Sequence, residues 1–326
     1  MALRKIIPIL LVALVAALPL LAPFTQVMLT LALAKGLAVL GIIVLLHAGQ
    51  VSFGHALFFA VAAYTAAFVG KSFAGGELVS MMVAGTLVAA VTGLFVGLFV
   101  VRYRHIFFGM LNLAFSMIFF SFLEKFYHIT GGSDGLQVLR PSVLGIEMER
   151  TGFEMLLFYG SLVICLAAGW ATWAFLRSPI GNMMQTIKTN EIRLEYLGIS
   201  ARSTLLVGYV VSAVLCGLGG VLMAVAQGIV TPEYAWWIRS GEFVFIAILG
   251  GANSVAGAFV GSLVYEIVRT YAAAFAADVW QMVLGVFLLA IILFASDGLV
   301  GMYNALMDRL GGKGGMRTDD AREAAE

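Results

Sequence analysis

The chain has few charged residues and almost no cysteine. Of its 326 residues, 11% are charged and 62% are hydrophobic, whereas soluble domains have about 25% and about 45–50%. A mean hydropathy of +1.02 over the whole length excludes a soluble domain on a single membrane anchor. The formal net charge of +1 gives no electrostatic basis for nucleic-acid binding. Cys165 and Cys216 both fall in apolar runs, which predicts buried thiols and not a disulfide or a metal site.

The sequence also lacks the residue patterns of an enzyme. The stretch nearest to a phosphate-binding loop is TAAFVGKS, Thr65 to Ser72, but a threonine replaces its first glycine and no strand precedes it. The four histidines show no paired metal spacing, and the acidic pair Glu147 and Glu149 lies in a polar loop. We therefore expect no catalytic residue, no metal site and no cofactor bound by this chain. If the chain moves a solute against its concentration gradient, the energy must come from a partner protein or a coupling ion.

Long apolar runs predict an all-α, polytopic integral membrane protein with about eight to ten transmembrane helices, because each crossing needs roughly 20 apolar residues. Continuous runs of this kind are not typical of a β-barrel. The run at 242–250 is too short to cross alone, so we expect it to extend back through Trp236 and Trp237 or to form half of a broken element. The predicted spans are 6–23, 27–46, 50–69, 78–101, 106–123, 153–176, 204–227, 242–250, 255–271 and 278–296.

The distribution of lysine and arginine predicts the orientation. An uncleaved first helix that keeps Arg4 and Lys5 in the cytoplasm places most basic residues on the cytoplasmic side, as the positive-inside rule requires. Both termini are then cytoplasmic. We interpret 1–308 as one transmembrane domain with an external loop at about 124–152 and a cytoplasmic insertion at about 177–203. The tail at 309–326 is expected to be cytoplasmic and disordered.

The cytoplasmic insertion carries the signals of a short helix. Asn190 suits an N-cap, Glu191 lies in the first turn, where the helix dipole favours an acid, and Gly198 suits the C′ position. They predict about two turns at 191–197, too few to be stable alone in water. Two interpretations follow from the spacing: a surface helix resting on its own bundle, or a helix that docks on a partner.

Polar residues and glycines interrupt the apolar runs at two further places. GQVSFGHAL, 49–57, either makes interhelical hydrogen bonds or lines a translocation path. GGANS, 250–254, either breaks a helix beside a cavity or forms a small-residue packing seam. The candidates for a translocation path or its gate are Gln50, Ser52, Gly54, His55, Gly250, Gly251 and Asn253.

Charged residues inside predicted spans are candidates too. Lys35 interrupts an apolar run, so it is a functional-site candidate, a snorkelling side chain or the partner of an acid elsewhere. Glu266 and Arg269 have the spacing of an intrahelical pair. In the external loop, TGGSDGL is either a turn-rich connection or a docking point for a binding protein. Its candidate contact residues are Thr130, Gly131, Ser133 and Asp134.

Four stretches, in this order along the chain, resemble the LivM-type permease of branched-chain amino-acid ABC importers. Gly49–Ala67 is similar to the family's GQ.SLGHAAFFGIGAYT and Thr130–Leu136 to its TGG.DGL. Arg177–Ala224 is similar to PIG…AI..NE..A..LGI followed by SA..AGLAG, and Ile248–Ser262 to ILGG.GS..GP..GA. The sequence departs from the pattern at Tyr196, usually alanine, and at Asn253 and Ala258, usually glycine and proline.

The resemblance implies a permease subunit in a prokaryotic cytoplasmic membrane. It implies a second permease subunit, with a heterodimer favoured, two cytoplasmic ATPases that hold ATP and Mg, and an external substrate-binding protein. The implied cargo is leucine, isoleucine or valine, with urea, short amides and aromatic acids as alternatives within the family. The alternative outside it is an ion-coupled secondary transporter that uses Lys35, His55 or Glu266. The residues implied to couple to the ATPase are Asn190, Glu191, Arg193, Leu197 and Gly198.

Overall fold

The computed structural model describes residues 12–20, 22, 25–72, 76–143, 145–146, 148–275, 279, 282, 284–287, 289 and 298–310. Of the predicted first span, residues 12–20 are described and helical. Most of the predicted span at 278–296, the tail from 311 onward, and Arg4 and Lys5 lie outside the described residues.

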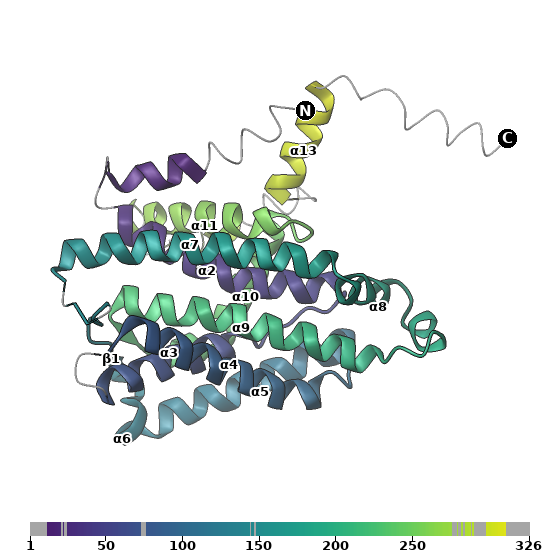
Figure 1. Cartoon of the computed structure of the whole chain (residues 1–326), viewed down its shortest axis with the longest axis horizontal. Helices are drawn as coiled ribbons and strands as arrows, with labels where there is room; N and C mark the ends of the chain where they lie inside the picture. Colours follow the sequence, from purple (N-terminus) through teal and green to yellow (C-terminus); the bar gives the residue numbers. More distant parts are fainter. Residues whose placement is uncertain are drawn as a thin grey trace.

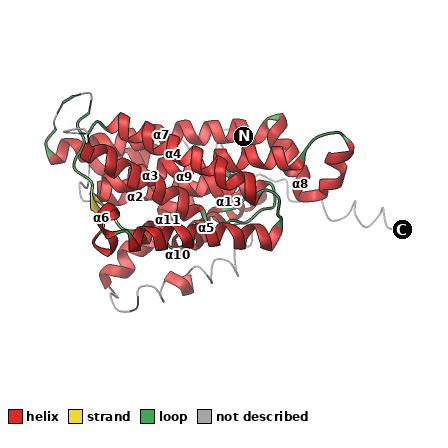
Figure 2. Ribbon diagram, turned by 90° about the horizontal axis from the view of Figure 1, so that it is seen from below, coloured by secondary structure: helices red, strands yellow, loops and turns green. Residues whose placement is uncertain are grey.

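Helices dominate the described chain, and most of the long ones lie along its longest dimension, whereas α13 stands across it (Figure 1). A two-stranded antiparallel sheet, in which Leu136 pairs with Val230, lies near one end of the bundle, and α8 lies at the opposite end (Figures 1 and 2). The elements are α2 (Thr25–His47), α3 (His55–Ser72), α4 (Leu78–Val100), α5 (His105–Lys125), α6 (Tyr127–Thr130), the 3-10 turn η1 (Gly132–Asp134), β1 (Leu136–Gln137), α7 (Arg150–Arg177), α8 (Pro179–Tyr196), α9 (Ala201–Gln227), β2 (Ile229–Val230), η2 (Pro232–Ala235), α10 (Trp237–Gly250), α11 (Val255–Phe275) and α13 (Gly298–Leu310).

Five described helices are long and apolar enough to cross a membrane: α2, α4, α5, α7 and α9. The bent pair α10 and α11 makes a sixth span if it is counted as one. The predicted span at 50–69 is only partly helical, because α3 begins at His55 and the preceding residues 50–54 are not helical. The architecture is therefore the all-α polytopic membrane bundle that the sequence predicts.

The helix at the centre of the bundle is α9, which packs against α2, α3 and α4. A Cβ added at Gly219 would overlap the carbonyl oxygen of Ala34 on α2, and one at Gly220 would overlap that of Phe59 on α3. Small residues of this kind let helix backbones approach closely in a membrane. The side of α4 that faces the bundle carries Gly85, Ala89, Gly93 and Gly97, all at four-residue spacing.

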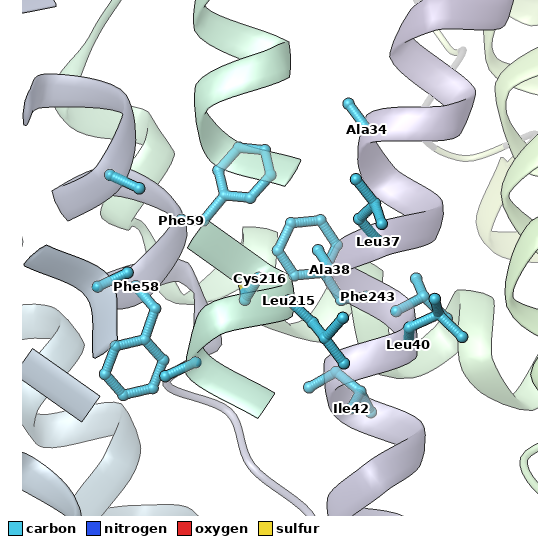
Figure 3. Close-up of a cluster of buried hydrophobic side chains, with 14 of the residues drawn as sticks. Ala34, Leu37, Ala38, Leu40, Ile42, Phe58, Phe59, Leu215, Cys216 and Phe243 are labelled. Carbon is cyan, nitrogen blue, oxygen red and sulfur yellow. The ribbon is translucent and has the colours of Figure 1, made fainter. Parts of the chain in front are cut away.

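Side chains from four helices interlock around α9 (Figure 3). Leu37 and Leu40 of α2 lie on one side and Phe59 of α3 on the other, with Leu215 of α9 and Phe243 of α10 between them. All five are at most 6% exposed. Because lipid is as apolar as these side chains, close packing, and not exclusion of water, favours this association.

The GGANS segment breaks the chain into the hairpin α10 and α11, whose axes differ by 113°. Gly251 takes φ 112° and ψ 104°, a conformation that a side chain would strain. A Cβ at Gly250 would overlap the carbonyl oxygen of Gly257, and one at Gly261 would lie 2.6 Å from that of Ile246. The segment thus both breaks the helix and forms a glycine packing seam, and α10 extends back to Trp237 as predicted.

The α9 packing predicts that Gly220→Ala destabilises the protein by about 1–3 kcal/mol, because the backbone of α3 has no room to move away from a new methyl group. Gly160→Ala on α7 is the matched control, since a Cβ there meets no atom within 4 Å. Thermal unfolding in detergent, followed by loss of the monodisperse size-exclusion peak, should show a lower midpoint for Gly220→Ala only. Equal midpoints for the two variants would show that α9 and α3 are not in close backbone contact.

Candidate functional site

The insertion that the sequence predicts to be cytoplasmic folds as α8, which has two parts. Its first part begins at Ser178, whose Oγ accepts a hydrogen bond from the Gly181 N–H at 3.3 Å, with proline in the first turn. At Asn190 the backbone leaves the helical conformation, with φ −160° and ψ 94°. The Asn190 Oδ1 then accepts from the Arg193 N–H at 3.1 Å, which starts a second, short arm that stops before Gly198 at φ 76°.

The short arm of α8, residues 191–197, therefore has the cap and the stop that the sequence predicts. The first part of α8, Pro179 to the break, was not predicted as helix. Its signals were the Ser-Pro start and the buried apolar positions Met184 and Ile187. They lie before the charged stretch that drew attention to the insertion.

The short arm exposes an apolar surface. Ile192 is 64% exposed, Tyr196 88% and Leu197 71%, whereas Leu194 at 2% packs the arm against the chain. We call Ile192, Tyr196 and Leu197 the α8 knob. Three large apolar side chains at the projecting end of the bundle (Figure 1) form the kind of patch that a partner covers.

Glu191 is held within the chain. Arg104, in the connection between α4 and α5, donates from Nε to Oε2 at 2.9 Å and from Nη2 to Oε1 at 2.7 Å. The same guanidinium donates to the carbonyl oxygens of Val101 and Tyr103 at the end of α4. Such a bidentate, charge-assisted pair is geometrically specific. The carboxylate that the sequence assigned to ATPase coupling thus joins α8 to the α4–α5 connection.

The connection between α2 and α3 meets the same region. The Gln50 Oε1 accepts from the His105 N–H at 2.9 Å, next to Arg104 in sequence, and His105 has the unusual φ of 53°. Gly49, at φ 71°, packs so closely on Lys188 of α8 that an added Cβ would lie 2.9 Å from its Cγ. Both connections and α8 are therefore joined at one end of the bundle.

The predicted path residues Ser52 and His55 hydrogen-bond in the interior. The Ser212 Oγ donates to the carbonyl oxygen of Gly41 at 2.7 Å, so it accepts from the His55 Nε2–H. The His55 Nδ1 lies 2.8 Å from the Ser52 Oγ. Both ring nitrogens of His55 are thus engaged in hydrogen bonds within the chain. Ser52, His55 and Ser212 are fully buried and join α2, α3 and α9.

The other predicted path residues lie in different surroundings. A Cβ at Gly54 would overlap the backbone of Asn112 on α5, so this glycine permits close packing. Gly250, Gly251 and Asn253 lie in or beside the α10–α11 turn. No hydrogen bond among the described residues joins this turn to the Ser52–His55 network.

The TGGSDGL segment forms a compact turn. The Thr130 Oγ1 donates to the carbonyl oxygen of Phe126 at 2.9 Å, and Gly131 has φ 73°. The Tyr127 hydroxyl donates to the Asp134 Oδ2 at 2.7 Å, and this hydrogen bond raises the pKa of the Tyr127 phenol. Thr130 is buried and supports the turn, whereas Ser133 and Asp134 are exposed.

Lys35 has two acidic partners in the middle of the bundle. Its Nζ lies 2.5 Å from the Glu242 Oε1 and 2.8 Å from the Glu266 Oε2, and the lysine side chain is 0% exposed. Glu266 also pairs with Arg269 at 3.6 Å, as predicted. Sequence reasoning missed Glu242, because it begins the short run at 242–250 and is distant from Lys35 along the chain. Its one signal was an acid inside an apolar helix.

These features define a polytopic membrane protein of the permease class: a helical bundle, a broken hairpin, buried paired charges and a helix that projects from one end. The family model for the permease component of branched-chain amino acid transport systems matches residues 24–292. The chain belongs to this family.

Several curated relatives are similar to the chain. The high-affinity branched-chain amino acid transport system permease protein LivM of Escherichia coli K12 is 26% identical over 78% of this chain and 64% of its own length. LivH of the same organism is 25% identical over 55% of this chain and 60% of its own. The nucleoside ABC transporter permease protein NupB of Lactococcus lactis is 28% identical over 34% and 30%. The chain thus spans somewhat less than two thirds of the length of LivM. No solved structure matches it at a significant level.

Lys35→Met should destabilise the protein by about 3–5 kcal/mol, because it leaves two carboxylates without their buried cation. Lys71→Met is the matched control, since Lys71 at the end of α3 is exposed. Thermal unfolding in detergent measures both, and a second substitution, Glu266→Gln, should restore part of the loss. If Lys35→Met unfolds like Lys71→Met, the buried pairing carries no stability.

Proposed function

We propose that the chain is a permease subunit of an ABC importer that moves branched-chain amino acids across a prokaryotic cytoplasmic membrane. The observation that carries the proposal, beyond family membership, is the exposed α8 knob on a short charged arm at the projecting end of the bundle. ATP hydrolysis in partner subunits supplies the energy. Family membership favours this function over an ion-coupled secondary transporter. Urea, short amides and aromatic acids stay as cargo alternatives.

The proposed complex has two permease subunits, two ATPases that hold ATP and Mg, and an external binding protein. In it, α8 faces the cytoplasm together with both termini, and an ATPase covers the α8 knob. The exposed Ser133 and Asp134 in the turn at the other end suit contact with the binding protein, while Thr130 and Gly131 hold that turn in shape.

We further propose how movement reaches the membrane. An ATPase that pulls on the short arm also displaces Arg104 through its pair with Glu191. Arg104 is bonded to the end of α4, and the adjacent His105 is bonded to Gln50 at the start of the segment that leads into α3. Displacing α8 therefore displaces the cytoplasmic ends of three transmembrane elements together. In this mechanism Asn190 and Gly198 fix where the arm begins and ends.

Replacing the knob should separate the permease from its ATPase. We expect the double variant Tyr196→Ala, Leu197→Ala to retain roughly a fifth or less of the wild-type ATPase on copurification from native membranes, because apolar anchors cost about 1 kcal/mol or more each when truncated. Glu195→Ala, on the same arm and exposed, is the control and should retain it. Leucine uptake into proteoliposomes of the complex should fall in parallel. The ABC assignment fails if the wild-type permease captures no ATPase, or if it transports leucine into liposomes without any partner subunit.

Glu191→Gln should have a different effect from loss of the knob. Because its carboxylate pairs with Arg104, we expect ATPase capture to stay within about twofold of wild type while uptake per ATP hydrolysed falls several-fold. Arg104→Gln should have the same effect. The double variant Glu191→Gln, Arg104→Gln should lose no more uptake than either single variant, because the effects of substituting two residues in contact are not additive. Glu195→Gln is the control. Loss of ATPase capture in Glu191→Gln would show instead that this carboxylate contacts the ATPase.

A further inference from the structure

One face of α10 combines exposed apolar and partly exposed charged side chains. Ile238 is 57% exposed and Phe245 45%, and Glu242, 12% exposed, lies between them at helical spacing. Arg239, 16% exposed, is at the edge of this face and its Nη1 lies 3.2 Å from the Glu242 Oε2. We call Ile238, Arg239, Glu242 and Phe245 the α10 face.

The α10 face lies deep in the membrane. Glu242 pairs with Lys35, near the middle of the spanning helix α2, and Lys35 also pairs with Glu266, near the middle of α11. With 14 residues, α10 is about 21 Å long and cannot cross a hydrocarbon core of about 30 Å by itself.

Charged groups at this depth do not face lipid, because hydrocarbon cannot solvate them. Glu242 and Arg239 are not sealed inside the chain either, since each keeps some exposed surface. By contrast, the outward side of α4 exposes Val83, Leu87 and Phe95 with no charge among them, as a lipid-facing helix should.

Arg239 has hydrogen-bonding capacity left. Among the described residues, the one hydrogen bond that its guanidinium makes is to Glu242, and it lies over the ring of Tyr234 at 5.6 Å. Both oxygens of Glu242 are already engaged, one by Lys35 and one by Arg239. An arginine has five N–H donors arranged to match a carboxylate. The site can therefore still donate hydrogen bonds, and the guanidinium charge and geometry favour a carboxylate as the acceptor.

We propose that the α10 face lines the water-filled translocation path, and that Arg239 receives the carboxylate of the transported molecule while Ile238 and Phe245 contact its aliphatic part. The inference rests on the proposed function and deepens it, because a small carboxylate with an apolar side chain is the chemistry of leucine, isoleucine and valine. Glu242, which Lys35 also contacts, holds Arg239 in place.

Thiol accessibility tests whether the face is wet. Ile238→Cys is compared with Leu87→Cys, which is 61% exposed on the lipid-facing side of α4. The assembled complex in proteoliposomes is treated with a negatively charged, membrane-impermeant methanethiosulfonate. Wild type gives the background, since both native cysteines are buried. We expect Ile238→Cys to react at least about tenfold faster than Leu87→Cys, because the charged reagent does not enter lipid, and leucine to slow that reaction.

Equal rates for Ile238→Cys and Leu87→Cys in a complex that still transports leucine would overturn the inference and leave the proposed function standing. If Ile238→Cys reacts faster than Leu87→Cys but the wild-type complex moves no branched-chain amino acid, the α10 face is accessible to water and only the assignment of the cargo is wrong.

Kinetics test the role of Arg239. At a saturating concentration of the binding protein, Arg239→Gln should lower leucine uptake per folded complex about tenfold, because a charge-assisted hydrogen bond to the cargo is lost, and Arg239→Lys should lower it less. An arginine that merely packs against Tyr234 and Glu242 would lower the amount of folded complex and leave uptake per folded complex unchanged. That result would overturn the contact between Arg239 and the carboxylate.

Discussion

The constraint on which the rest of the bundle depends is the close approach of α9 to α2, α3 and α4. Membrane helices gain little from burying apolar side chains, because lipid offers the same environment. They associate where backbones come near enough for dense van der Waals contact. In this chain Gly219 and Gly220 on α9 leave room for the carbonyl oxygens of Ala34 and Phe59. A methyl group at either position would push α9 away from α2 or α3, the helices that the Ser52–His55–Ser212 network joins.

Polar groups then specify how the packed helices align. The Ser52–His55–Ser212 network joins the start of α3 to the middle of α9, and Lys35 joins α2 to both arms of the α10–α11 hairpin. Leaving a polar group without a hydrogen-bond partner inside a membrane costs roughly several kcal/mol. A shift of one helix along its neighbour would break these contacts and is therefore unfavourable. The two networks anchor the two elements that do not span as continuous helices.

The proposed function places different roles at the end of the bundle that carries α8 and in its interior. At the end proposed to be cytoplasmic, α8 combines the exposed α8 knob with an ion pair between Glu191 and Arg104. The short arm can thus be held by a partner on one side and by the transmembrane helices on the other. In the interior, α10 presents a partly exposed arginine, at the face proposed to line the translocation path. Between them, the hydrogen-bonded loops at Gln50 and His105 connect α8, on which the ATPase is proposed to pull, to α3, α4 and α5, which are proposed to move.

The sequence by itself determined the membrane class, the approximate bounds of the long apolar helices, and the cap and stop of the short arm at Asn190 and Gly198, while it left a break at GGANS as one of two alternatives. These depend on local chemistry: apolar run length, capping residues and glycine conformation. Only the tertiary structure decided that Lys35 meets Glu242 as well as Glu266, that Glu191 pairs with Arg104, and that Ser212 bonds His55. Such contacts join residues far apart in the chain, and the residue types alone allow many partners. Geometry set by the α9 packing selects one of them.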